Sequence, residues 1–188
     1  MNLAFWTGIV FIIAEALNIF LGLIMGLKPT HLYLVGFQVS QTLYVIVQIV
    51  CAICAFIFYL GFFMTGKTLK NSLLKVSALL FIVVEVISYN ISAFMFDAEK
   101  FTSLYYSIFT MIFYGCVGVP FGIGILKLNN HLGSYATITG IFTIILYATL
   151  LAVILFFVAM FLWLPVMILQ LILLYKVKEQ YDFTKNIP

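Results

Sequence analysis

Hydrophobic residues in this sequence form long, uninterrupted runs that are separated by short polar segments. The runs stay apolar instead of alternating at every second residue, which excludes the strands of a membrane β-barrel. A helix of about 20 apolar residues crosses a hydrocarbon core of about 30 Å. We therefore predict an all-α transmembrane bundle with six spans. The approximate spans are 3–26, 41–64, 76–97, 105–126, 136–156 and 159–177.

The last two spans are the hardest to separate. Residues 136–175 contain no charge, and as one helix they would be about 60 Å long, twice the hydrocarbon thickness. The chain must therefore reverse, and we place the reversal within residues 155–163. Pro165 suits the first turn of a final helix and Trp163 suits a membrane interface. A helix that began at Pro165 would be short, so an interfacial segment before it remains an alternative.

Composition supports an integral membrane protein. Hydrophobic residues make up 65% of the chain and charged residues 8%, with a mean hydropathy of +1.24, whereas soluble domains are about half apolar and a quarter charged. The start, MNLAFWTG, has no basic region before its apolar run, so we expect a retained span and not a cleaved signal peptide. We expect one domain over residues 1–178 and a short cytoplasmic tail over 179–188.

The basic residues indicate an orientation. All nine are Lys, they occur singly, and there is no Arg, so the net charge of +3 does not point to nucleic acid. Six spans place both termini on the same side as the second and fourth loops. That side carries Lys67, Lys70, Lys75, Lys127, Lys176, Lys178 and Lys185, and the other carries Lys28 and Lys100. The Lys-rich side, with both termini, is predicted to be cytoplasmic. We expect a bacterial plasma membrane, although an organelle membrane would give the same pattern.

Two carboxylates lie inside the predicted spans. Glu15 and Glu85 occur about 12 and 9 residues past the entry of spans one and three, which run in the same direction, so both are expected near the midplane with the spans side by side. An ionised acid there costs at least about 2.5 kcal/mol, and no span contains a Lys to pair with it. We expect at least one of the two to be protonated at pH 7.

Polar neighbours follow both acids at helical spacing. Asn18 is three residues after Glu15, and Ser88 and Tyr89 follow Glu85 by three and four, so each helix carries a polar stripe of its own. Gln48 of span two could join them. These six residues are our candidate ion- or proton-binding site. The alternative is a set of interhelical hydrogen bonds worth about 1 kcal/mol each.

Span four contains a glycine-rich segment around a proline. Gly118 and Gly122 have the spacing that lets helix backbones approach closely, Gly115 precedes them, and Pro120 is expected to kink the helix. The segment is a candidate gate in a transporter. Close packing or dimerisation is the competing interpretation.

Other reactive residues give weaker patterns. Cys51 and Cys54 form a C-x-x-C motif, but Cys116 is the only further cysteine and also lies in a span, so small packing side chains are favoured over redox chemistry. His31 and His131 fall in loops on opposite faces, without ligand spacing for a metal. We predict no metal, no cofactor and no catalytic constellation.

The sequence leaves two functions open. The first is movement or sensing of a proton, cation or small solute through the midplane carboxylates. The second is a non-catalytic membrane subunit, assembly factor or immunity-type protein that acts through its helix faces. The lipid bilayer is the expected surrounding in both cases, and a homo-oligomer or a membrane-protein partner fits the second.

Overall fold

The computed structural model describes residues 2–26, 41–94, 100–152 and 155–185. Within these ranges every regular element is a helix, and six of the helices are long and apolar enough to cross a membrane. The predicted six-helix, multi-pass membrane protein is thus confirmed. The elements are α1 (Asn2–Gly26), α3 (Gln41–Thr68), α4 (Ser72–Phe94), α5 (Lys100–Leu126), the single turn α6 (Asn129–Leu132), α7 (Ser134–Leu151) and α8 (Phe156–Lys185).

Several helices extend beyond their apolar runs. α3 continues past the predicted residue 64 to Thr68, and α4 begins at Ser72 instead of residue 76. The hydropathy pattern detects only the part of a helix that lies in hydrocarbon, so polar turns at its ends are missed. Residues 95–97 of the predicted third span lie outside the described residues.

The reversal between the last two helices differs from the prediction. α7 ends at Leu151, earlier than residue 156, and α8 already begins at Phe156, so the connection between the two helices overlaps the predicted segment only at Leu155. Pro165 lies well inside α8 and not in its first turn, and the helix includes the residues we considered interfacial. A membrane helix tolerates an internal proline because neighbouring helices and local adjustments satisfy the freed backbone groups.

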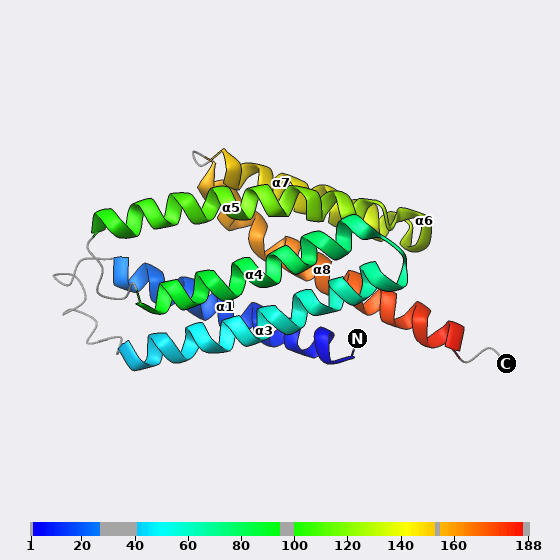
Figure 1. The fold of residues 1–188 in the computed structure, drawn as a ribbon, viewed down its shortest axis with the longest axis horizontal. Coiled ribbons are helices and arrows are strands. Elements are labelled where there is room, and N and C mark those ends of the chain that lie inside the picture. Colours follow the sequence, from blue (N-terminus) through cyan, green and yellow to red (C-terminus); the bar gives the residue numbers. More distant parts are fainter. Residues whose placement is uncertain (1, 27–40, 95–99, 153–154, 186–188) are drawn as a thin grey trace.

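The contacts between the six long helices follow chain order and close into a ring. α1 packs on α3, α3 on α4, α4 on α5, α5 on α7 and α7 on α8, and a smaller contact between α8 and α1 closes the ring. The expectation that spans one and three lie side by side is wrong at the level of the backbone, because α3 packs between α1 and α4. Both ends of the described chain lie at one end of the bundle, next to α6 and the α3–α4 connection (Figure 1); we call this the terminal end.

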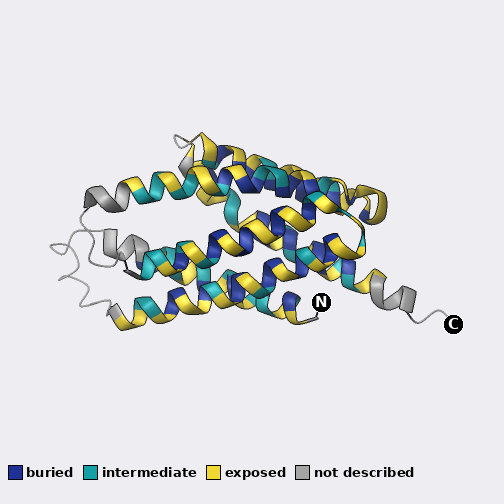
Figure 2. Ribbon diagram, viewed as in Figure 1, coloured by how far each residue is buried: buried dark blue, intermediate teal, exposed yellow. Residues whose placement is uncertain are grey.

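Aromatic side chains fill the bundle interior towards the terminal end. Tyr59 stacks on Phe81 with ring centroids 4.8 Å apart, and Phe121 packs edge-on against Phe81 and Phe62, each at 5.0 Å. All four are at most 2% exposed, and so is Phe58 beside them. We call these five residues the aromatic core. Exposed residues instead lie on the outer faces of the helices (Figure 2), as expected for surfaces that meet lipid.

Glycines bring α5 close to its neighbours along the same half. A Cβ atom on Gly118 would overlap the ring of Tyr147, and one on Gly122 would lie 2.7 Å from Ile144 on α7. On the opposite side, a Cβ on Gly124 would lie 2.8 Å from the Cα of Leu74 on α4. The close packing of α5 between α4 and α7 therefore requires glycine at these positions.

Candidate functional site

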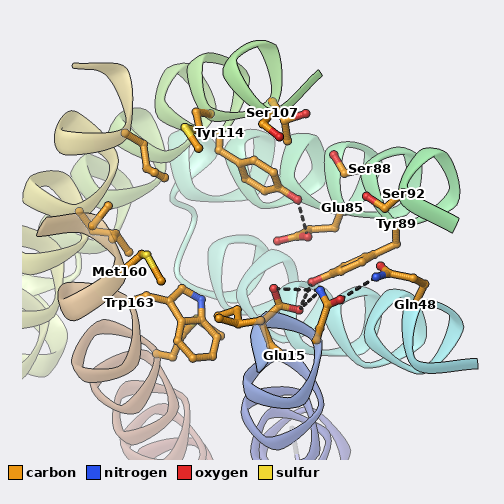
Figure 3. Close-up of a pocket in the computed structure, with 18 of the residues that line it drawn as sticks. Glu15, Gln48, Glu85, Ser88, Tyr89, Ser92, Ser107, Tyr114, Met160 and Trp163 are labelled. Carbon is orange, nitrogen blue, oxygen red and sulfur yellow. Dashed lines mark hydrogen bonds between the residues drawn. The ribbon is translucent and has the colours of Figure 1, made fainter. Parts of the chain in front are cut away.

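A cavity of about 450 Å³ is lined by residues of all parts of the ring (Figure 3). These lining residues belong to the half of the bundle away from the terminal end. All six long helices contribute to its wall, and the aromatic core bounds it on the terminal side through Tyr59. The polar and aromatic lining residues are Phe11, Glu15, Asn18, Tyr44, Gln48, Tyr59, Glu85, Ser88, Tyr89, Ser92, Tyr106, Ser107, Thr110, Tyr114, Tyr147 and Trp163.

Glu15 and Glu85 both line this cavity. Glu15 follows the first residue of α1, Asn2, by 13 positions, and Glu85 follows the first residue of α4, Ser72, by the same 13. Both carboxyls therefore lie near the middle of their helices. Glu85 is buried at 6% exposure, whereas Glu15 is partly exposed. The structure thus brings the two predicted acids to one internal space, although their helices do not pack together.

Glu15 accepts hydrogen bonds from two helices. The hydroxyl of Tyr89 on α4 donates to Glu15 Oε2 at 2.6 Å, and Asn18 Nδ2 lies 3.4 and 3.5 Å from the two carboxyl oxygens. Gln48 Nε2 on α3 donates in turn to Asn18 Oδ1 at 2.6 Å. The chain from Gln48 through Asn18 ends on Glu15, so its donors converge on this carboxyl group.

Glu85 has its close partner on a different helix from the one we expected. The hydroxyl of Tyr114 on α5 donates to Glu85 Oε2 at 2.6 Å (Figure 3). Tyr89, which we expected to support Glu85 from its own helix, lies between the two acids: its short hydrogen bond goes to Glu15 at 2.6 Å, and it also interacts with Glu85. Ser88 lines the cavity, and its backbone carbonyl accepts a hydrogen bond from Tyr106 at 2.8 Å. Each carboxyl is therefore tied to a tyrosine across a helix boundary.

One buried polar atom on the wall has no partner among the described residues. Gln48 is 2% exposed and lines the cavity, and its Oε1 atom accepts no hydrogen bond there. A buried acceptor without a donor costs about 1–3 kcal/mol. A ligand or water that carries a donor would remove this penalty.

The cavity carries acidic groups without basic ones. None of the described residues on its wall is Lys, Arg or His. The exposed ion pair between Lys176 and Glu179 belongs to the last turns of α8, near the terminal end. A group that compensates the carboxyls must therefore be a proton or must enter the cavity from outside.

The predicted site residues separate into two groups. The six residues predicted to bind an ion or proton all line the cavity, namely Glu15, Asn18, Gln48, Glu85, Ser88 and Tyr89. Gly115, Gly118 and Gly122 instead adjoin α7, where Leu151, Tyr147 and Ile144 leave no room for a Cβ, and Pro120 lies within the same stretch of α5. The glycine segment thus packs within the chain, and its role as a gate stays a prediction.

Sequence reasoning missed the tyrosines that complete the wall. Tyr44, Tyr59, Tyr114 and Tyr147 lie in spans, and Trp163, which we assigned to a membrane interface, also lines the cavity. For Tyr59 and Tyr114 the available signal was a phenol hydroxyl far from either end of a span, since a buried hydroxyl needs a partner. Hydropathy alone could not show that these rings face one cavity.

The remaining candidates are the cysteines and histidines, of which Cys51 contacts Glu15. Cys51 and Cys54 are buried free thiols and Cys116 is an exposed one. No group of three or more His, Cys, Asp or Glu side chains suited to a metal occurs in the part of the chain that the structure describes. His131 lies in α6, and His31 falls outside the described residues.

Comparison of the chain with protein-family models, with characterised proteins and with solved structures gave no match. The cavity and its residues therefore carry the functional argument alone.

Proposed function

We propose that the protein moves a proton, cation or small solute across the membrane, with Glu15 and Glu85 as the acceptors. The observation that carries this proposal is the presence of both carboxyls on one membrane-embedded cavity whose described wall holds no basic side chain. Intramembrane acids are expensive, and they mark ion or proton pathways when they face a cavity.

The energetics favour a reversible positive charge at this site. One ionised carboxylate at the bilayer centre costs at least about 2.5 kcal/mol, and a second nearby adds repulsion. Tyrosine donors offset part of this penalty at Glu15 and at Glu85. A proton or cation that enters the cavity offsets the rest of this free-energy cost. Binding is then favourable, yet weak enough to be reversed.

The shape of the interior fits a transporter open on one side. The cavity occupies the half away from the terminal end, and the aromatic core fills the other half. With the Lys-rich terminal end in the cytoplasm, the cavity would belong to the outer half. The Lys distribution fits the bacterial plasma membrane, and it fits an organelle membrane equally. Passage to the cytoplasm would require movement in the aromatic core, for which α5 with Gly118 and Pro120 is the candidate element.

The rival function, a subunit that acts through its helix faces, receives less support. Its strongest sequence feature was the small-residue face of α5, and Gly115, Gly118 and Gly122 of that face pack against α7 of the same chain. That face is therefore already covered. The exposed apolar side chains on the outer surface are those that a lipid surrounding needs.

Flux through reconstituted protein tests the proposal. Vesicles that contain the protein and an internal pH-sensitive dye would be given a Na⁺ or K⁺ gradient, and an uptake assay would follow labelled organic cations. We expect protein-dependent flux that is lost in Glu85→Gln and reduced in Glu15→Gln.

A matched control separates this effect from damage to the fold. Thr65 is 1% exposed and its hydroxyl bonds Gly61 O within α3, outside the cavity wall, so Thr65→Val should retain flux. Wild-type protein without flux of any of these species, or Gln variants with full flux, would reject the proposal and favour the rival subunit.

A further inference from the structure

We propose that the cavity binds an organic cation, a molecule with an ammonium-type charge and an apolar body, and not a monatomic ion. This inference rests on the proposed function and names its substrate class. It follows from the combination of charge, aromatic surface, volume and an unpartnered acceptor at one place.

The charge requirement comes from the two carboxyls. Glu15 and Glu85 enter the cavity from α1 and α4, and the described wall offers no cation to pair with them. Anionic ligands would add to the repulsion, and neutral ligands would leave it unchanged. A positive ligand is the one class whose binding the wall favours electrostatically.

The aromatic surface selects the kind of cation. Six tyrosines, Phe11 and Trp163 line the cavity together with the carboxyls. The faces of such rings attract ammonium and quaternary ammonium groups, and aromatic cages are the usual means of recognising them. The tyrosines that line it are Tyr44, Tyr59, Tyr89, Tyr106, Tyr114 and Tyr147.

The rest of the wall suits an apolar body. Trp163 and Met160 lie together on α8, on the other side of the cavity from Glu85 and Ser88 (Figure 3). Met111 and Met167 also line it. Methionine side chains are flexible and polarisable, so they adapt to ligands of irregular shape.

The volume argues against a bare metal ion. A cavity of about 450 Å³ falls within the range of about 300–1,000 Å³ that holds drug-sized molecules. Hard metal ions such as Ca²⁺ need six or more oxygen ligands at about 2.3–2.6 Å, and no suitable acid, histidine and cysteine cluster occurs among the described residues. An organic cation fills such a space and leaves the carboxyls on their tyrosine donors.

Gln48 supplies an independent sign of a ligand. Its Oε1 atom is buried on the cavity wall without a donor from the described residues. An N–H of a primary, secondary or tertiary ammonium would satisfy it. Ammonium ligands that carry an N–H should therefore bind more tightly than their quaternary analogues. In a Gln48→Leu variant, this difference in affinity should disappear.

Binding in detergent tests the inference without any need for transport. The chain has two tryptophans; Trp163 lines the cavity, whereas Trp6 is 64% exposed near the terminal end. In a Trp6→Phe protein, Trp163 alone reports on the cavity. The probes are tetraphenylphosphonium and tetraphenylborate, which share a shape and differ in the sign of their charge.

We expect saturable quenching of Trp163 by tetraphenylphosphonium that excess Na⁺ or K⁺ does not displace, with tetraphenylborate binding at least about tenfold more weakly. Glu85→Gln should weaken binding of the cation by about tenfold or more. Tyr106→Leu should weaken it while Tyr106→Phe, which keeps the ring face, should not. Thr65→Val should match the parent, and equal thermal unfolding would show that the weakened variants are folded.

The outcomes separate this inference from the proposed function. Equal binding of both probes, or binding that ignores the Glu85 variant, would overturn the inference by indicating simple partition. Glutamate-dependent flux of protons, Na⁺ or K⁺ without cation-selective binding would also overturn it and leave the proposed function standing. Cation-selective binding without any flux would support the inference and reject transport.

Discussion

The hydroxyl of Tyr89 lies 2.6 Å from Glu15 Oε2 and joins two helices whose backbones do not pack together. α1 and α4 are separated by α3 along the ring, so this hydrogen bond joins their side chains at the cavity wall and does not belong to a helix–helix packing contact. Tyr89 therefore has two effects, since it donates a hydrogen bond to an acid inside the bundle and links α4 to α1.

Tyr89→Phe should destabilise the protein by about 1 kcal/mol, because Glu15 loses its shortest donor while the ring remains in place. Chemical unfolding in detergent would measure the change. Tyr135→Phe is the matched control, since Tyr135 is half exposed near the terminal end and should lose almost nothing. Equal stability of the two variants would show that the Tyr89 hydroxyl does not support Glu15.

Gly118→Ala should destabilise the protein by about 1–3 kcal/mol, the usual penalty of overpacking a close contact. The added methyl would overlap the Tyr147 ring, so α5 must move away from α7. Thermal unfolding of purified protein would measure the loss.

A second substitution tests this explanation. Tyr147→Ala removes the ring that the methyl meets, so adding Gly118→Ala to it should cost much less than adding Gly118→Ala to the wild type. Additive effects in the double variant would show that the close approach of these two residues is not the cause.

The number and class of helices followed from the sequence because hydrocarbon imposes a minimum apolar length on each span. The turn before Phe156 did not follow, since residues on either side of it are equally apolar and no Gly or Asn marks it. Pro165 misled the prediction because proline is tolerated inside a membrane helix as well as in its first turn.

The acidic half of the site was predictable, whereas its partners were not. A carboxyl in an apolar run is conspicuous because placing an acid in the membrane costs free energy. The i to i+3 spacing then identified Asn18 beside Glu15. Tyr114 and Trp163 line one cavity with Glu85 and Glu15 only because of the ring order of the helices. That order depends on packing between distant segments, including glycine contacts such as Gly122 with Ile144, which a single sequence does not encode as a local pattern.

Asn71→Ala should destabilise the protein by about 2 kcal/mol. Asn71 Oδ1 accepts from the backbone N–H of Leu74 at the start of α4, and its Nδ2 donates to Gly124 O on α5 at 2.7 Å. The substitution removes both a helix cap and an interhelical hydrogen bond, each worth about 1 kcal/mol. Unfolding would give the total, and Asn71→Ser, which keeps the cap alone, should recover about half of it. A variant that unfolds like the wild type would contradict this role.

Lys70→Gly should stabilise the protein by up to about 1 kcal/mol. Lys70 has a φ of 52° in the turn between α3 and α4, a left-handed conformation that disfavours side chains with a Cβ. Glycine removes that strain, and Lys70→Asn should give a smaller gain in the same direction. Unfolding measurements would rank the three proteins, and a less stable glycine variant would show that the Lys70 side chain makes a compensating contribution.

Affinity for tetraphenylphosphonium should increase as the pH is raised. A proton and an organic cation both neutralise the carboxyls of Glu15 and Glu85, so they compete for the same cavity. None of the described residues that line this cavity is basic. Lowering the pH favours binding of the proton and should weaken binding of the organic cation. Its dissociation constant should rise by up to tenfold per pH unit for each proton displaced. Titration of Trp163 fluorescence in the Trp6→Phe protein, across the pH range in which it stays folded, would measure this slope. Glu85→Gln should flatten it because one of the two competing acids is gone, whereas the same slope in that variant would assign the competing proton to Glu15 alone.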